Sequence, residues 1–236
     1  MVEAVIFDVD GTLVDSVDLH ARAWQEALAH FGHPVAFEAV REQIGKGGDQ
    51  LMPVFVPEAE LARIGEQLEQ FRTDLYRRKY LPQVKALPGV RALFERLLAD
   101  GKRIALASSA KGEELQTYKR LADIEDLVGA EASADDAQRS KPHPDIFEAA
   151  LEELGHPAPN LCVVVGDTPY DVTAARGAHL RTVGVLSGGF PAESLWGAGA
   201  VAVYRGPEDL LAHYARSPDT ALEGGLAAVE ETGAPG

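Results

Sequence analysis

Residues 3–16 read EAVIFDVDGTLVDS, and the fold can be worked outward from this stretch. Its apolar letters VIF predict a short buried strand, and two acids, Asp8 and Asp10, follow that strand directly. Side chains two residues apart in an extended chain project to the same face, so the two carboxylates can enter one site. Gly11 lets the chain turn sharply after them, and Thr12 adds a hydroxyl. Because ligands of open α/β sheets bind at the carboxyl ends of the strands, the stretch predicts a site there.

The composition is typical of a globular protein without a membrane segment. The chain has 236 residues, 46% of them hydrophobic, which suffices for one large domain or two modest ones. No apolar run approaches the roughly 20 residues that a membrane helix needs, and the N-terminal MVEAVIFD lacks the features of a signal peptide. The single cysteine, Cys162, lies in the apolar run LCVVV and excludes a disulfide scaffold. We therefore expect a cytoplasmic protein with no membrane partner.

The formal net charge of −15 narrows the possible partners. Nucleic acid is not expected, because a phosphate backbone needs a basic stripe and the sequence has none. An anionic small molecule would also be repelled unless cations reverse the field at its site, and a bound metal ion would do so. The oligomeric state does not follow from the sequence, and a monomer is the simpler expectation.

The hydrophobic periodicity changes along the chain. Residues 17–82 show helical spacing of apolar residues in three segments and no strand pattern, so they predict an all-helical module. Beyond them, helices alternate with short apolar strands, which is typical of a parallel sheet covered on both faces. The predicted fold is a Rossmann-like α/β core with an inserted helical cap. The predicted boundaries are 1–16 and 83–216 for the core, 17–82 for the cap and 217–236 for a mobile tail.

Further polar residues follow the ends of predicted strands or precede helices. Ser108 and Ser109 follow IALA, Asp167 and Asp171 follow VVVG, and Lys141 stands in SKP just before a helix. Each alone has an ordinary structural explanation as a helix cap, a first-turn acid or a surface cation. In a parallel sheet, however, the ends of neighbouring strands meet at one edge, so these residues can join Asp8 in one site.

Together with the string DxDGTLxDS, the order and spacing of these residues resemble the haloacid dehalogenase-like hydrolase superfamily, from the first strand to about residue 214. The inserted module resembles the helical cap of the subfamily that includes β-phosphoglucomutase and phosphoglycolate phosphatase. The resemblance implies a Mg²⁺-dependent phosphatase that hydrolyses a small phosphomonoester, a sugar phosphate or a phosphoglycolate-like compound, through an aspartyl-phosphate intermediate.

The resemblance also implies a role for each motif residue. Asp8 would be the nucleophile, and Asp10 would be the general acid and base. The groups that bind the phosphoryl group would be Thr12, Ser108, Ser109 and Lys141. The Mg²⁺ ligands would be Asp8, Asp10 through its backbone carbonyl and Asp167, with Asp171 beside them.

Elementary electrostatics agrees with that assignment. Oxygen ligands and a phosphate partner favour Mg²⁺, a hard cation that keeps several waters. Four converging carboxylates would carry more negative charge than Lys141 and one divalent cation neutralise, so one proton is expected in the site. We expect it on Asp10, which must donate a proton to the leaving alkoxide.

Substrate selection must come from the cap, because the core motifs contact only the phosphoryl group and the metal. The candidate cap residues are His20, Trp24, Gly45, Lys46 and Gly47. His20 and Trp24 in LHARAW also resemble the cap helix of a sugar-phosphate mutase, so mutase activity stays an alternative. The loop GKGGD at 45–49 lacks the arginine with which that mutase grips a second phosphate.

Other readings are less favoured. A non-catalytic binding protein on the same fold is opposed by the intact motifs, and dehalogenase activity is opposed by the presence of Asp10. Phosphonate cleavage would need a cap lysine that forms a Schiff base; Lys46 is a cap lysine, but the surrounding pattern does not match. Gly188 and Gly189 predict a turn.

Overall fold

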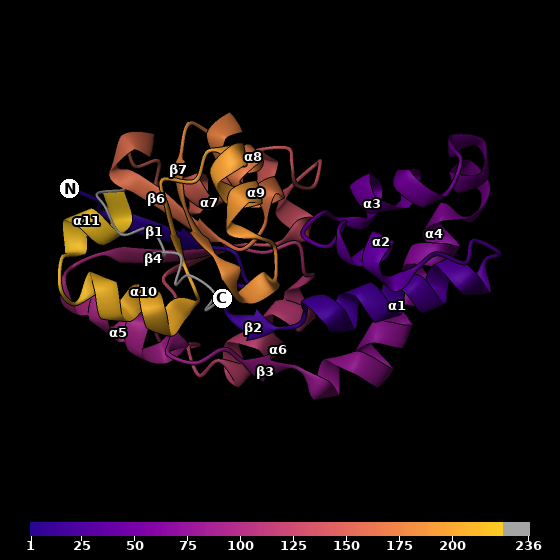
Figure 1. The fold of residues 1–236 in the computed structure, drawn as a ribbon, viewed down its shortest axis with the longest axis horizontal. Helices are drawn as coiled ribbons and strands as arrows, with labels where there is room; N and C mark the ends of the chain where they lie inside the picture. Colours follow the sequence, from indigo (N-terminus) through magenta and orange to yellow (C-terminus); the bar gives the residue numbers. More distant parts are fainter. Residues whose placement is uncertain (224–236) are drawn as a thin grey trace, which may run out of the picture.

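The computed structural model describes residues 1–223. A six-stranded sheet lies at the centre of its larger part, the part shown on the left in Figure 1. The strand order is β5-β4-β1-β6-β7-β8, and every pair in it is parallel. The strands are β1 (Ala4–Phe7), β4 (Arg103–Ala107), β5 (Ala130–Ala132), β6 (Cys162–Gly166), β7 (Arg181–Val185) and β8 (Ala202–Tyr204). The predicted α/β fold with a parallel sheet is confirmed.

Helices cover both faces of the sheet. They are α5 (Val90–Ala99), α6 (Gly112–Leu121), α7 (Asp145–Glu153), α8 (Pro169–Gly177), α9 (Ala192–Ala198), α10 (Pro207–Tyr214) and α11 (Pro218–Glu223). Strand β1 is buried on both sides: Phe7 packs with Phe94 of α5 on one face, whereas Ile6 packs with Phe147 of α7 on the other. This two-sided burial explains why the central strands are apolar at every position.

A second, all-helical part lies beside the carboxyl end of the sheet (Figure 1). It contains α1 (Val17–His30), α2 (Phe37–Arg41), α3 (Gly48–Phe55), α4 (Glu58–Leu75), the π-helical turn η1 (Tyr76–Tyr80) and the short turn η2 (Leu81–Gln83). Its own apolar core includes Trp24, Leu28, Leu51 and Leu68. The domain boundaries proposed from the sequence remain a proposal.

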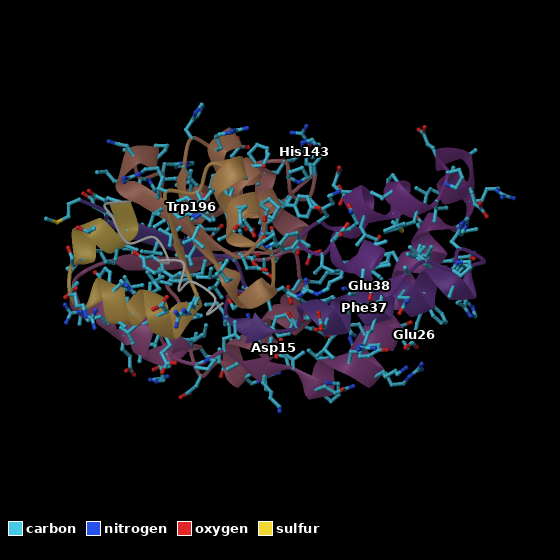
Figure 2. All side chains as sticks on the ribbon, in the orientation of Figure 1. Asp15, Glu26, Phe37, Glu38, His143 and Trp196 are labelled. Atoms are coloured by element: carbon cyan, nitrogen blue, oxygen red, sulfur yellow. The ribbon has the colours of Figure 1, made fainter. Side chains whose placement is uncertain are left out.

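Two short strands connect the two parts. Strands β2 (Val14–Asp15) and β3 (Lys85–Ala86) pair antiparallel, so both chain crossings run through one narrow ribbon. Figure 2 shows Asp15 at this ribbon, with Phe37 and Glu38 on the helical side of the junction. A two-stranded connection with few contacts is a suitable hinge for a cap.

Three elements are not indicated by the hydrophobic periodicity of the sequence. Helix α3 begins at Gly48 and contains Pro53, two residues that disfavour helices, so the segment carries little helical signal. Strand β5 has only three residues and gains its structure from pairing with β4. Helix α9 is seven residues long and contains Gly197. In each case tertiary packing outweighs local propensity.

The predicted mobile tail begins too early. Residues Pro218–Glu223 form α11, in which Ala221 and Leu222 are buried, and Tyr204 donates a hydrogen bond from its hydroxyl to the carbonyl of Ala221 at 3.2 Å. Two buried side chains suffice to dock so short a helix, although they do not make a periodic pattern. The rest of the predicted tail, 224–236, lies outside the described residues. Among the helices of residues 1–223, none has the length and apolar character needed to cross a bilayer.

Candidate active site

The strand order brings the sequence motifs together. Strand β1 lies between β4 and β6, so Asp8, Ser108 and Asp167, which follow these three strands, lie at one edge of the sheet. The backbone N–H of Asp8 donates to the carbonyl of Val165 at 2.9 Å and extends the pairing to the site. The juxtaposition expected from the sequence is therefore present.

Three buried carboxylates form a compact cluster. Asp8, Asp167 and Asp171 each offer an oxygen, and these oxygens lie within 4.8 Å of one another. Thr12 donates its hydroxyl to Oδ1 of Asp167 at 3.0 Å or to Oδ2 of Asp8 at 3.3 Å. Oδ2 of Asp167 is buried and has no hydrogen-bond partner among the described residues. A buried carboxylate oxygen without a donor fits a divalent cation, and an all-oxygen donor set fits Mg²⁺.

Lys141 balances part of this negative charge. Its ammonium contacts Oδ1 of Asp8 and lies 2.7 Å from Oδ1 of Asp171. The other oxygen of Asp171 accepts from the backbone N–H of Thr168 at 3.0 Å and from the Thr168 hydroxyl at 2.7 Å. Asp171 thus closes the N-terminus of α8 and holds Lys141 in place, with both of its oxygens occupied.

Burial sets the protonation of the cluster. Burial, together with Asp171 and Asp10, raises the pKa of Asp8 to about 7 against the opposing effect of Lys141. Burial and the neighbouring carboxylates also raise the pKa of Asp167. The pKa of Lys141 lies above its usual value: burial lowers it, but Asp171 and Asp8 outweigh that effect. Without a metal ion the cluster therefore retains protons, because three carboxylates surround one cation.

Asp10 behaves differently from the sequence expectation. Its Oδ1 accepts from the Ser16 hydroxyl at 2.5 Å and lies 2.8 Å from Nε2 of His20. Burial raises the pKa of Asp10, but His20, Ser16 and Arg72 outweigh burial and hold it below the ordinary value. Without a metal ion, therefore, His20, Ser16 and Arg72 favour the charged form of Asp10, whereas burial favours the protonated forms of Asp8 and Asp167.

The candidate phosphate-binding serines lie beside this cluster. Ser108 is fully buried, and its hydroxyl accepts from the N–H of Ala110 at 3.0 Å, which shapes the loop after β4. Ser109 lines a cleft of about 220 Å³ that also reaches Asp8 and Asp10. Thr12 and Lys141 contact the carboxylates directly.

The cap closes over the same cleft. The predicted cap candidates His20, Trp24, Gly45, Lys46 and Gly47 all line it. The glycines have a role that the sequence did not reveal: a Cβ at Gly45 would overlap Thr168, and one at Gly47 would overlap Ser140. Lys46 donates to Oε1 of Gln43 at 2.5 Å and lies 4.8 Å from the ring centroid of Tyr170. The loop is therefore fitted against the core.

Two further residues that line the cleft belong to no sequence motif. Arg72 of α4 donates from Nη2 to Nδ1 of His20, and its guanidinium lies 5.1 Å from the Trp24 ring centroid. Glu69 lies one turn earlier on the same helix and also lines the cleft. In the sequence both belong to the polar side of an amphipathic helix, so no pattern marks them as site residues.

The family model described as haloacid dehalogenase-like hydrolase matches residues 2–179. This chain belongs to the haloacid dehalogenase-like hydrolase family. The predicted resemblance and the prediction that the chain is a hydrolase are thereby confirmed.

Curated relatives match most of the length of this chain. A protein of Thermotoga maritima named phosphorylated carbohydrates phosphatase is 30% identical over 213 residues, which cover 89% of this chain and 96% of that protein. A Yersinia pestis protein named phosphoglycolate phosphatase is 33% identical over 218 residues, which cover 91% of this chain and 90% of that protein. The solved structure of a hydrolase from Pseudomonas syringae superimposes with a TM-score of 0.81 at 32% identity, covering 91% of this chain and 99% of the other.

Proposed function

We propose that this chain is a Mg²⁺-dependent phosphatase of small phosphomonoesters, such as sugar phosphates or phosphoglycolate-like compounds, that acts through an aspartyl-phosphate on Asp8. The observation that carries the proposal is the meeting of three buried carboxylates with Lys141 at the end of β1, while Asp10 is bound to His20 instead. The names of the curated relatives support the class of substrate.

The residues that would hold Mg²⁺ are Asp8, Asp167 and the backbone carbonyl of Asp10, with Asp171 supporting them through Lys141. When bound, the ion supplies positive charge that neutralises the phosphoryl oxygens and aligns them for displacement. Asp167 has the clearest claim to a ligand role, because its Oδ2 is buried without a partner among residues 1–223.

In the first step, an oxygen of Asp8 attacks phosphorus and the bond between phosphorus and the ester oxygen breaks. Lys141 holds Oδ1 of Asp8, so Oδ2, which has only the longer 3.3 Å contact with the Thr12 hydroxyl among the described residues, is the oxygen proposed for the attack. Lys141 and the hydroxyls of Ser108 and Thr12 are placed to stabilise the charge that spreads over the phosphoryl oxygens. In the second step, water attacks the aspartyl-phosphate and releases inorganic phosphate, which restores the Asp8 carboxylate.

Asp10 would give a proton to the leaving alkoxide and later take one from the attacking water. Its contacts with Ser16 and His20 both use Oδ1, so Oδ2 is available for the proton. A phosphate dianion that enters the cleft adds negative charge beside Asp10 and raises its pKa, which favours proton uptake when substrate is bound.

The test is a panel of phosphomonoesters assayed for phosphate release with Mg²⁺ and with EDTA. We expect Mg²⁺-dependent turnover that Asp8→Asn abolishes, together with a phosphorylated protein detected by mass spectrometry after acid quench of the wild type. Asp15→Asn is the matched control, because Asp15 is exposed and lies in β2, outside the cluster. Turnover that persists in EDTA or in Asp8→Asn would contradict the proposal.

A sugar-phosphate mutase remains the alternative. Such an enzyme must grip a second phosphate, and the cap loop GKGGD at 45–49 lacks the arginine that would do so. The same panel, run with a hexose monophosphate plus the corresponding bisphosphate, tests it: isomerised hexose phosphate without phosphate release would replace the phosphatase assignment.

A further inference from the structure

The ring of His20 is held in one tautomer and one orientation. Arg72 has only N–H donors and contacts Nδ1, so that nitrogen must accept, and the ring proton resides on Nε2. Nε2 then donates to Oδ1 of Asp10 at 2.8 Å. His20 is therefore a fixed donor to Asp10, and whatever orients its ring also orients the Asp10 carboxyl.

Tyr118 is the second core residue that contacts this nitrogen. Its hydroxyl lies 3.1 Å from Nε2 of His20, and its side chain, from α6, is 1% exposed. The residues that line the cleft include His20, Asp10 and Glu114 but not Tyr118. Tyr118 can thus act on the reaction only through another residue.

The direction of each hydrogen bond around Tyr118 follows from the donors available. The Tyr118 hydroxyl donates to Oε1 of Glu114 at 3.1 Å, since an ionised carboxylate can only accept. The Tyr76 hydroxyl, 2.6 Å away, must then donate to the Tyr118 oxygen. This orientation leaves a Tyr118 lone pair, which shares the single Nε2–H of His20 with Oδ1 of Asp10. Burial raises the pKa of Tyr118 well above the usual value, so the hydroxyl stays protonated.

Tyr76 fixes the remaining freedom of the imidazole. Its ring stacks on that of His20 with centroids 3.9 Å apart and planes 9° apart. The stack sets the plane of the imidazole, and Tyr118 and Arg72 set its rotation within that plane. Because Tyr76 and His20 come from the cap while Tyr118 and Glu114 come from the core, the arrangement is complete only when the two parts are together.

We propose that Tyr118 is a positioning residue for the general acid Asp10, that it acts through His20, and that Glu114 orients its hydroxyl. This inference rests on the proposed phosphatase function. It predicts a dependence on the leaving group. An alkoxide is a poor leaving group and needs a well-placed proton donor, whereas p-nitrophenolate leaves without one. Loss of Tyr118 positioning should therefore lower kcat/KM for alkyl phosphates and spare p-nitrophenyl phosphate.

The experiment compares Tyr118→Phe with wild type on an alkyl phosphate and on p-nitrophenyl phosphate. The value of kcat/KM is used because it covers the steps up to release of the leaving group. One lost neutral hydrogen bond predicts a decrease of roughly five- to tenfold for the alkyl ester and less than about twofold for the aryl ester. Glu114→Gln, which keeps the shape of the side chain, should shift the same ratio in the same direction.

Tyr204→Phe is the matched control. Tyr204 is equally buried, and its hydroxyl donates to the carbonyl of Ala221, away from the cleft. Its removal should leave the alkyl-to-aryl ratio unchanged, and thermal unfolding of all variants shows whether each is folded. A Tyr118→Phe enzyme that loses both activities equally, or neither, would overturn the positioning role. A wild type that hydrolyses neither ester with Mg²⁺ would instead overturn the proposed function.

Discussion

Gly188 lies directly against the carboxylate of Asp167. A Cβ on Gly188 would overlap Oδ2 of Asp167, the buried oxygen that has no hydrogen-bond partner among residues 1–223. Gly188 ends the short turn that follows β7, so a residue more than twenty positions away limits the space around a proposed metal ligand. Only glycine fits there, and the requirement is one of space, not of backbone conformation.

Gly188→Ala should therefore push the Asp167 carboxylate aside and weaken Mg²⁺ binding. We expect at least a tenfold loss of Mg²⁺ affinity by isothermal titration calorimetry, of the size seen when the support of a metal ligand is disturbed. Gly197→Ala is the matched control, because a Cβ at that helical glycine meets no atom within 4 Å and should be neutral or slightly stabilising. Equal Mg²⁺ affinity in both variants would show that Asp167 is not a ligand.

Lys141 should be essential for the stability of the metal-free protein. Lys141→Met keeps much of the side-chain volume but leaves Asp8 and Asp171 without their buried cation. Breaking a buried ion pair in this way is expected to lower the free energy of unfolding by about 3 to 5 kcal/mol at pH 8. Urea denaturation in EDTA measures it, with the exposed Lys85→Met as control. A decrease in the free energy of unfolding of less than about 1 kcal/mol would mean that water or bound protons neutralise the charge of Asp8 and Asp171 when Lys141 is absent.

The raised pKa of Asp8 predicts how stability depends on pH without metal. Because the folded-state pKa, about 7, exceeds the ordinary value of 3.8, the folded state binds a proton more tightly than the unfolded chain does. Stability should therefore fall as pH rises through this window, by on the order of 2 kcal/mol between pH 5 and pH 8. The carboxyls with lowered pKa, such as Asp10 and Asp145, act in the opposite sense but below that range.

Urea unfolding in EDTA across this range measures the slope. Asp8→Asn should flatten it, and saturating Mg²⁺ should reverse it, because the cation then replaces the proton among the carboxylates. Stability that rises from pH 5 to pH 8 in EDTA would show that Asp8 is ionised throughout in the folded protein.

How far the sequence predicts this site depends on whether the chemistry is local. Asp8, Asp10, Ser108 and Asp167 each follow an apolar strand, and the parallel sheet brings strand ends together, so periodicity indicates that they can meet, while the family resemblance implies what each would do. Gly188 and Tyr118 could not, because their roles arise from contacts across the fold: one clears space for a carboxylate, and the other meets a histidine from the cap.

The protonation of Asp10 shows the same limit. The sequence suggests crowded carboxylates and hence a raised pKa, but the largest effect that lowers the Asp10 pKa comes from His20, a residue of the helical part, with smaller effects from Ser16 and Arg72. A count of charges near a motif omits such a contribution. The glycines of the cap loop show the same dependence on the fold, because Gly45 and Gly47 lie against Thr168 and Ser140 of the core, which the local sequence does not indicate.

Asp10→Asn should separate proton transfer from metal binding. The amide oxygen can still accept from Ser16 and His20, and the backbone carbonyl is unchanged, so the site geometry is retained. We expect kcat to fall by at least about 100-fold, the scale of general acid–base catalysis, with Mg²⁺ affinity nearly unchanged. Asp167→Asn, in contrast, should lose both. Calorimetric Mg²⁺ titration of the two variants checks this, and equal losses of affinity would contradict the separate roles.

Substitution of Lys46 tests whether the cap loop recognises the leaving group. Its ammonium lines the cleft, burial lowers its pKa, and it is held between Gln43 and the ring of Tyr170, which belongs to the core. Lys46→Ala removes this cation without touching the carboxylate cluster. For the best natural ester we expect kcat/KM to fall by roughly ten- to a hundredfold, as for a charged hydrogen bond in a closed site.

A small generic substrate such as p-nitrophenyl phosphate should change by less than about threefold, because its leaving group makes no specific polar contact with the loop. Tyr170→Phe is the matched variant: it keeps the ring beneath Lys46 and removes only the hydroxyl that donates to the Glu42 carbonyl at 2.6 Å. If both Lys46→Ala and Tyr170→Phe lower the two activities equally, the loop matters for cap closure and not for recognition. A loss confined to Lys46→Ala and to the natural ester assigns the contact to the leaving group.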